Sequence, residues 1–428
     1  MPDEATEDRS TGGTPFRRHV RVFLAARFAA SSALQMQGVA VGWYVYALTD
    51  SAFDLGLIGL VQFLPMIGLA LPAGHFVDRH ARRPVAVAAF TIEALCSLSL
   101  AAMALTGVGG AASVFLVIAL YGVGRAFEQP AMNSWLPTLV PAREFPRVAA
   151  ANSLTSQTAV IVGPAIGGFL YLAGPHVPFL AAAVLQACGL VAIMRLPAQR
   201  AAARGPLSSA ALLEGVRFIW RNELVLGALT LDFVCVLFGG AVALMPIFAR
   251  DILAVGPAGL GILRSAPALG ALTMGIVLTR RPPQRRIGRR LLVTVAVYGA
   301  ATLLFGVSRS FALSLAALVV VGGADMLSVV IRHTMVQLAA PDAIRGRVTA
   351  VFGLFTGASN QLGQFESGVT AAWFGPVASV VLGGLATVAV VAYWAQRFPV
   401  LRRMDRLVPA EAPMDRPRET VSGSTHRL

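Results

Sequence analysis

The sequence lacks lysine altogether, so all 35 of its basic residues are arginine. A Walker A loop needs a lysine on the nucleotide phosphates. A pyridoxal or retinal Schiff base needs a lysine amine. The absence of lysine therefore excludes a P-loop ATPase and a Schiff-base cofactor, and nothing else in the sequence indicates a cofactor.

Cysteine is nearly absent, with three residues among 428. Cys96, Cys188 and Cys235 stand alone in apolar runs, and an odd number cannot pair completely. We expect free thiols that act as small core side chains. The histidines form no metal-ligand cluster, so the sequence predicts no metal site.

Charge is also scarce, because charged residues make up 13% of the chain, about half the usual share in a soluble domain. Hydrophobic residues make up 56%, and the mean hydropathy is +0.70. This composition indicates a polytopic membrane protein. The net charge of +14 comes from arginines beside apolar runs, which favours membrane lipids over nucleic acid as the partner.

Twelve apolar runs are long enough to cross a bilayer, which takes about 20 residues of helix. They are too long for barrel strands, and backbone groups in lipid must be paired internally. The sequence therefore predicts an all-α membrane protein with twelve transmembrane helices. The runs are 20–47, 54–77, 84–106, 111–133, 146–172, 176–196, 222–248, 256–279, 288–308, 311–334, 346–370 and 374–396.

The arginines in the connections alternate from one side to the other. One side holds nearly all of them, whereas the opposite loops contain only Arg250 and Arg309. Loops rich in basic residues stay in the cytoplasm. We therefore expect both termini in the cytoplasm and the chain in the inner membrane of a bacterium.

The longest internal connection, 197–221, divides the runs into two sets of six that resemble each other. A shift of 200 residues places Pro141 on Pro341 and Arg147 on Arg347. Such a repeat predicts two pseudo-symmetric six-helix bundles, an architecture of transporters. The expected parts are a cytoplasmic tail (1–19), an N-terminal bundle (20–196), a cytoplasmic linker (197–221), a C-terminal bundle (222–396) and a second cytoplasmic tail (397–428).

The loop after the second run carries a distinctive motif, which reads Gly-His-Phe-Val-Asp-Arg-His-Ala-Arg-Arg from Gly74 to Arg83. It resembles the signature of the major facilitator superfamily between its second and third helices, with Ala81 in place of the second glycine. The resemblance covers about residues 17–396 and implies the fold of that superfamily.

The resemblance also implies a gate at the cytoplasmic end. In the superfamily the loop aspartate, here Asp78, meets the start of the eleventh helix, where Arg345 or Arg347 could pair with it. A carboxylate near a helix N-terminus also complements the helix dipole. The arginines could instead only fix the topology, and the two roles are compatible. The expected gate motif consists of Gly74, Asp78, Arg79, Arg82, Arg83, Arg345 and Arg347.

The fifth run contains the sequence Gly-Pro-Ala-Ile-Gly-Gly. It resembles part of the antiporter signature of drug exporters, with Ala159 where that signature has glycine, and so it implies export. A packing hinge is the alternative, because glycine and proline permit bending and close helix approach. The expected hinge motif consists of Gly163, Pro164, Gly167 and Gly168.

Two further segments, 130–137 and 337–348, resemble the branch of the superfamily that contains enterobactin and macrolide exporters. That resemblance implies proton-driven efflux of bulky amphipathic molecules, such as drugs or siderophores, by alternating access. The expected partners are this small substrate, protons and membrane lipids. We expect the chain to function as a monomer.

Ionisable residues inside the spans are the candidates for proton coupling, because their burial is costly. Asp232 and Asp325, and then Glu93, are the expected carriers, since a carboxyl group in an apolar cavity can exchange its proton. A static buried ion pair is an equally good interpretation for each. The residues expected in buried charge pairs are Arg27, Arg125, Glu128 and Arg264.

Other functions remain open at this point. The same fold could serve as a lysophospholipid flippase or a nutrient importer. An intramembrane aspartyl protease would use Asp232 and Asp325, but Asp325 lacks the directly preceding glycine of those enzymes, and they have no repeat of two six-helix halves. We therefore expect a transporter and not an enzyme.

Overall fold

The computed structural model describes residues 13–197, 209–341 and 344–405, and every regular element in these ranges is helical. The helices are α1 (Gly13–Thr49), α2 (Ala52–Arg79), α3 (Arg82–Thr106), α4 (Ala111–Leu139), α5 (Phe145–Tyr171), α6 (Val177–Met194), α7 (Ser209–Arg221), α8 (Glu223–Phe238), α9 (Ala241–Ile247), the π-helical turn η1 (Phe248–Ile252), α10 (Gly256–Arg280), α11 (Ile287–Val307), α12 (Phe311–Ala339), α13 (Arg345–Phe374), α14 (Pro376–Arg397) and α15 (Pro399–Arg403).

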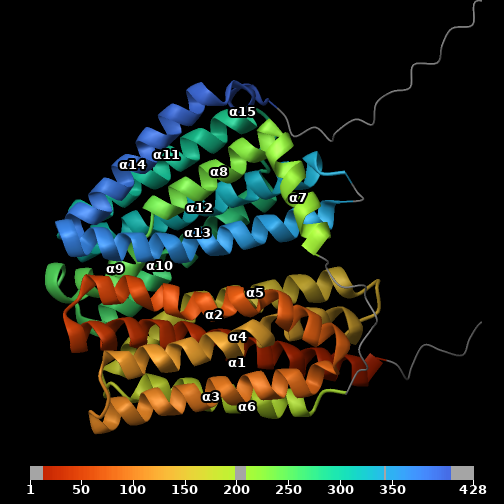
Figure 1. The fold of residues 1–428 in the computed structure, drawn as a ribbon, viewed down its shortest axis with the longest axis vertical. Coiled ribbons are helices and arrows are strands. Elements are labelled where there is room, and N and C mark those ends of the chain that lie inside the picture. The colour runs from red at the N-terminus through yellow and green to blue at the C-terminus, as the bar shows by residue number, and fades with distance from the viewer. Residues whose placement is uncertain (1–12, 198–208, 342–343, 406–428) are drawn as a thin grey trace, which may run out of the picture.

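The long helices form two bundles, one from α1–α6 and one from α8–α14 (Figure 1). Neighbours in the first bundle follow the order α2, α4, α3, α6, α1, α5. Neighbours in the second follow the order α10, α12, α11, α14, α8, α13. The two orders correspond when α8, α9 and η1 are taken together as one span. Helices α10, α12, α11, α14, α8 and α13 then occupy the places of α2, α4, α3, α6, α1 and α5. The packing therefore has the pseudo-symmetry that the repeat predicts.

Ten helical segments in the described ranges are long and apolar enough to cross a membrane, and α8, α9 and η1 form one of them. The helices α1 and α13 are also long, with 37 and 30 residues, but they are more polar. Both lie inside the bundles among the other ten. The prediction of an all-α, multi-pass membrane fold is therefore confirmed.

Short polar signals set the ends of several helices. Ser51 caps α2 by accepting a hydrogen bond from the amide of Asp54 at 3.2 Å, and Asn222 caps α8 by accepting one from Val225 at 3.1 Å. The helix α3 ends at Gly107, whose φ of 67° suits glycine. Asn222 is the single residue between α7 and α8, and the chain changes direction there, because α7 crosses the direction of α8 (Figure 1).

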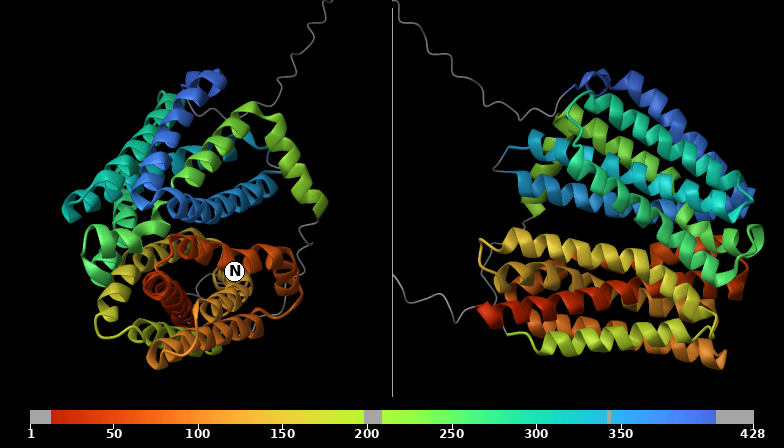
Figure 2. Two further views of the ribbon diagram at one scale, coloured as in Figure 1. Left: turned by 60° about the vertical axis from the view of Figure 1, so that its left-hand side comes forward. Right: turned by 180° about the vertical axis from the view of Figure 1, so that it is seen from behind.

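The bundles contact each other mainly through two helix pairs, α5 with α10 and α2 with α13 (Figure 2). Glycines permit this approach: a β-carbon on Gly56 of α2 would lie 2.8 Å from the Cα of Gly368 in α13. One on Gly168 of α5 would lie 3.0 Å from the Cα of Gly261 in α10. These contacts lie at the end of the molecule where α2 and α10 begin, which we call the arginine-poor end.

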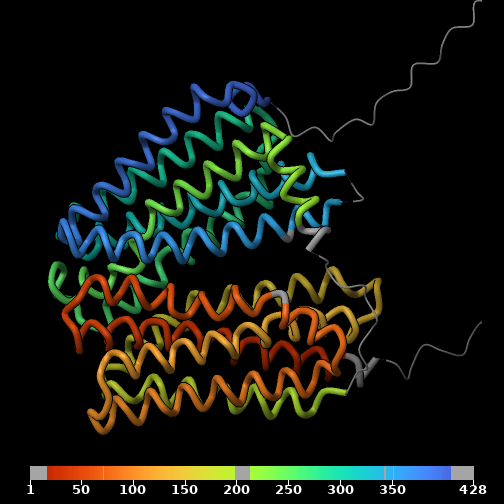
Figure 3. The backbone as a smooth tube through the Cα atoms, viewed as in Figure 1, coloured from red at the N-terminus to blue at the C-terminus, as the bar shows by residue number. Residues whose placement is uncertain are grey.

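The arginine-rich end, at which α1 begins and α14 ends, is more open. A β-carbon built on Gly68 or Gly74 of α2, or on Gly353 or Gly357 of α13, would meet no atom within 4 Å. The green segment of α9 and η1 reaches the N-terminal bundle at the opposite, left-hand end of Figure 3. The bundles are thus joined at one end and separated at the other.

Candidate functional site

A cavity inside the C-terminal bundle contains much of its buried charge. The cavity has a volume of about 240 Å³, and both Asp232 of α8 and Arg332 of α12 line it. The Arg332 Nη1 lies 2.6 Å from the Asp232 Oδ1, and each side chain is only 3% exposed. The hydroxyl of Thr356 in α13 donates to the other Asp232 oxygen at 3.4 Å. Each charge of this buried pair is therefore compensated, as burial requires.

Asp325 lines the same cavity but does not share the ion pair. It lies seven residues before Arg332 on α12, about two turns along the same helix face. Its side chain is exposed to the cavity, and it makes no ion pair with any residue that the structure describes. The structure thus brings the two expected carriers together, one held by an arginine and one open.

The N-terminal bundle has a charged cluster of its own. Glu128 of α4 is fully buried and pairs with Arg125, one turn before it on the same helix. The Arg27 Nη1 of α1 lies 3.8 Å from the other Glu128 oxygen. Arg27 also donates through Nε to the Ser156 hydroxyl of α5 at 3.4 Å. One carboxylate is therefore shared by two arginines, which leaves the cluster with an excess positive charge.

Glu93 of α3 is fully buried beside this cluster, and neither of its oxygens has a hydrogen-bond partner among the described residues. One turn further on, the Ser97 hydroxyl donates to Gln37 at 2.7 Å. Gln186 joins them in the amide orientation in which it donates to Ser97 at 2.8 Å and accepts from Tyr121 at 3.1 Å. Glu93 thus lies one turn from a chain of buried polar groups that joins α3 to α1, α6 and α4.

Arg264 of α10 faces the other bundle and has no acidic partner among the described residues. A β-carbon on Gly38 of α1 would lie 3.4 Å from its Nη1 atom. No carboxylate in the described ranges lies within ion-pair distance of it. Arg264 is therefore placed between the bundles and apart from the buried pairs.

The residues of the expected gate motif do not meet in this structure. Arg347 pairs with Glu214 of α7, and Arg345 donates through Nε to the Gln337 carbonyl at 2.9 Å. Asp78 makes no ion pair within the described parts of the chain, although Asp342 and Ala343, next to Arg345, lie outside them. The end of α2 and the start of α13 are thus apart here.

The other residues of the gate motif lie at the arginine-rich end. Arg83 donates to the Met194 carbonyl at the end of α6, and this contact ties α3 to α6. Arg82 is 5% exposed, whereas Arg79 is exposed. Gly74 lies in the last two turns of α2.

The expected hinge motif of α5 forms packing surfaces on two sides. Gly163 and Gly167 lie against Gln35 and Met36 of α1, where a β-carbon on Gly167 would be 2.9 Å from the Met36 backbone. Gly168 lies against α10 of the other bundle. The motif therefore lets α5 pack closely within its own bundle and against the second bundle at once.

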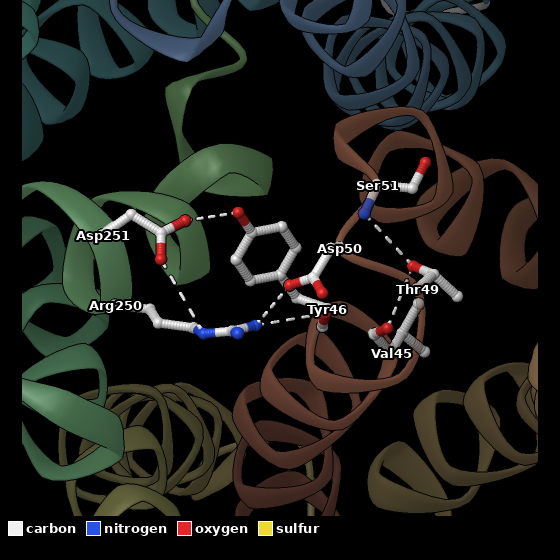
Figure 4. A network of polar contacts seen from close by, with 7 residues as sticks. All are labelled: Val45, Tyr46, Thr49, Asp50, Ser51, Arg250 and Asp251. Carbon is white, nitrogen blue, oxygen red and sulfur yellow. Dashed lines mark hydrogen bonds and ion pairs between the residues drawn. The ribbon is translucent and has the colours of Figure 1, made fainter.

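A polar network joins the bundles at the arginine-poor end (Figure 4). Arg250 of η1 donates to the Asp50 carboxylate at 2.7 Å and to the Tyr46 carbonyl at 3.4 Å. Its guanidinium lies 5.1 Å from the centre of the Tyr46 ring. The Tyr46 hydroxyl donates to Asp251, the next residue of η1. The end of α1 is thus fixed to the π-helical turn of the other bundle.

Comparison with known proteins agrees with this architecture. The model of the major facilitator family described as transmembrane secretion effector matches residues 10–422. The chain belongs to this family. Its membership, together with the two-bundle fold, makes the protein a transporter of the major facilitator superfamily and excludes the protease alternative.

This transmembrane secretion effector is similar to a siderophore exporter. It is 26% identical over 368 residues to the enterobactin exporter EntS of Escherichia coli O1:K1, which covers 85% of this chain and 87% of the relative. The EntS protein of Shigella boydii serotype 18 matches with the same values.

Solved structures with the same fold include other transporters. The nucleoside transporter NupG superposes with a TM-score of 0.69 at 15% identity, over 89% of this chain and 99% of NupG. A bacterial homologue of the human lysosomal transporter Spinster, inward-facing and unoccupied, superposes with a TM-score of 0.67 at 16% identity. This match covers 91% of this chain and 97% of the homologue. These similarities concern the fold.

Two groups in this transporter are not among the predicted site residues. Arg332 is a charge inside a span, and its spacing of seven from Asp325 places both on one helix face. The network at the arginine-poor end is the other group, since the position of Arg250 in a connection predicts no contact for it. The signal for it was the pair Arg250-Asp251 on a side of the chain with almost no other charge.

Proposed function

We propose that this transporter is a proton-coupled exporter of bulky amphipathic small molecules, which works by alternating access. The proposal places the arginine-rich end in the cytoplasm, following the distribution of basic residues. Contact between the bundles at the arginine-poor end, with separation at the other, then corresponds to a state open to the cytoplasm.

The cavity that contains Asp232, Asp325 and Arg332 is the observation that carries the proposal. Asp325 is open to the cavity, while the neighbouring carboxylate is held by Arg332. An arginine between two carboxylates can exchange one for the other, and the released carboxyl group can then take up a proton. Such an exchange would give the bundle two states that differ in bound protons, as coupled transport requires.

The cargo class follows from the similarity to an enterobactin exporter and remains at the level of a drug or siderophore. Enterobactin is therefore the first compound to test, and a macrolide antibiotic is the second. Both are bulky molecules with polar and apolar parts, as the proposed cargo class requires.

Everted membrane vesicles from cells that produce the protein provide the test. With an acidic vesicle interior, we expect at least one of the two compounds to accumulate inside, and we expect a protonophore to abolish that accumulation. Vesicles from cells without the protein are the control. Accumulation that persists after the pH gradient has been collapsed would contradict proton coupling, and the absence of transport for both compounds would contradict the cargo class.

A further inference from the structure

The helix α7 has two unlike faces. One face packs on the C-terminal bundle, where Gly215 and Ile219 are buried and where a β-carbon on Gly215 would lie 3.1 Å from the Arg347 carbonyl oxygen. The opposite face exposes Leu213 and Trp220, which are 66% and 67% exposed. A large exposed tryptophan and leucine on one short helix indicate a partner, because water is a poor environment for them.

The exposed apolar residues share their face with positive charge. Leu213, Arg217 and Trp220 have the spacing of four and three that aligns side chains on an α-helix, and Arg221 lies beside them. Both arginines are exposed, and neither has an ion-pair partner among the residues that the structure describes. Large apolar side chains flanked by arginines are typical of helices that lie in a membrane surface.

The position of α7 also fits a membrane surface. Only Asn222 separates its last residue, Arg221, from the membrane-spanning segment that begins at Glu223. Figure 1 shows α7 crossing the right-hand ends of the C-terminal helices at a steep angle, whereas the spans run from left to right. A helix that crosses the spans and joins one of them directly lies close to the plane of the headgroups.

We propose that α7 is a membrane-surface helix that binds anionic phospholipids, with Trp220 and Leu213 at the level of the acyl chains and Arg217 and Arg221 on the phosphate headgroups. Exposed arginines attract anionic headgroups, and tryptophan prefers the interface between headgroups and hydrocarbon. The Glu214–Arg347 ion pair then joins the lipid-bound helix to α13, one of the helices that contact the other bundle.

Quenching of Trp220 fluorescence by brominated lipids tests this proposal in nanodiscs. The discs contain phosphatidylcholine and phosphatidylglycerol in a fixed ratio, and the bromine label is placed on one lipid or the other at equal mole fraction. The signal of Trp220 is obtained by subtracting the Trp220→Phe variant. We expect brominated phosphatidylglycerol to quench Trp220 at least about twofold more than brominated phosphatidylcholine, because two arginines enrich the anionic lipid beside it.

Replacement of both arginines, Arg217→Gln with Arg221→Gln, should remove the difference between the two lipids. The matched control, Arg285→Gln with Arg289→Gln, changes two exposed arginines in the connection before α11 and in its first turn, at the same end, and should preserve it. Equal quenching by both lipids in the unmodified protein, or no quenching by either, would overturn the proposal. The measurement needs no cargo and no pH gradient, so its outcome is independent of the proposed export function.

Discussion

Asp232 and Asp325 have the same side chain, yet their surroundings differ. Asp232 is enclosed and held by Arg332 at 2.6 Å, whereas Asp325 faces the cavity without an ion pair among the described residues. A buried pair is fixed by the cost of separating its charges. The open carboxyl group is therefore the better candidate to exchange a proton during transport.

We predict that Asp325→Asn keeps the fold and the binding of cargo but abolishes uphill, pH-driven transport, because an amide mimics a permanently protonated acid. Asp232→Asn should behave differently, since it leaves Arg332 buried without a counter-charge, at a cost of about 3–5 kcal/mol. Its thermal stability and all of its transport modes should fall together. Thermal unfolding and transport in vesicles, measured on both variants, distinguish these outcomes.

The double variant Asp232→Asn with Arg332→Gln is the control, because it removes both charges and should recover much of the lost stability. Full pH-driven transport by Asp325→Asn would exclude this residue as the carrier. Proton coupling would then be sought at Glu93, the buried carboxyl group without a hydrogen-bond partner in the described ranges.

Ion pairs within one helix could be predicted from the sequence, but ion pairs between distant helices could not. The sequence placed Arg125 and Glu128 on one face of one helix, because residues three apart on a helix are neighbours. The pair between Asp232 and Arg332 joins α8 to α12 across 100 residues. Which residues meet in such a pair depends on how two helices are rotated against each other, and spacing along the chain does not contain that information.

The π-helical turn η1 follows α9 at the place where the two bundles meet. It directs Arg250 and Asp251 toward the end of α1, where they contact Tyr46 and Asp50 of the other bundle. Irregular turns of this kind are frequent at functional sites because they place side chains that a regular helix would direct elsewhere. Alternating access would require this network to break.

We predict that Arg250→Gln weakens closure at the arginine-poor end. Exposed ion pairs contribute about 0.2–1 kcal/mol each, so the population open at this end should rise by roughly 1.5- to 5-fold. Spin labels on Val108→Cys and Val307→Cys, in a background without the native cysteines, report the distance between the two bundles at this end. We expect a larger long-distance fraction in the variant.

Arg309→Gln is the matched control for this measurement. Arg309 is the other arginine of the arginine-poor loops, it is exposed, and it makes no ion pair with a described residue. Its replacement should leave the distance distribution unchanged. An equal change in both variants would show that net charge, and not the Arg250 network, determines the position of the bundles.

The fold of the molecule as a whole could be predicted, because the apolar runs and the repeat of the two halves extend through the chain. The helices follow the apolar runs, and the two halves repeat the same order of neighbours. The helix α7 in the linker 197–221 was not predicted, because it is too short and too amphipathic to register as a span. The break of the run 222–248 into α8, α9 and η1 and the short helix α15 were not predicted either. The relative position of the two halves could not be predicted either, because the proposed alternating access would change it.

The expected orientation gives a prediction for the intact cell. After Cys188→Ser removes the exposed native thiol, a single cysteine at Val108 or Ala173 should react with a membrane-impermeant maleimide added outside. A cysteine at Gln284 should react only after the membrane has been permeabilised. These positions lie in or beside connections at opposite ends of the bundles. The reverse labelling pattern would invert the topology and contradict export.

The glycine contact between α5 and α10 lies close to one end of α5, so a rotation about this contact would move the two ends of α5 by very different distances. Gly168 lies three residues from the end of α5, while its other end, Phe145, lies 23 residues away, or roughly 35 Å along the axis. A rotation of about 15° around this contact, the size of the rotation between haemoglobin's two states, would move the far end by roughly 9 Å. A small rearrangement at the glycine contact would thus displace the far end of α5 by about the width of a small molecule.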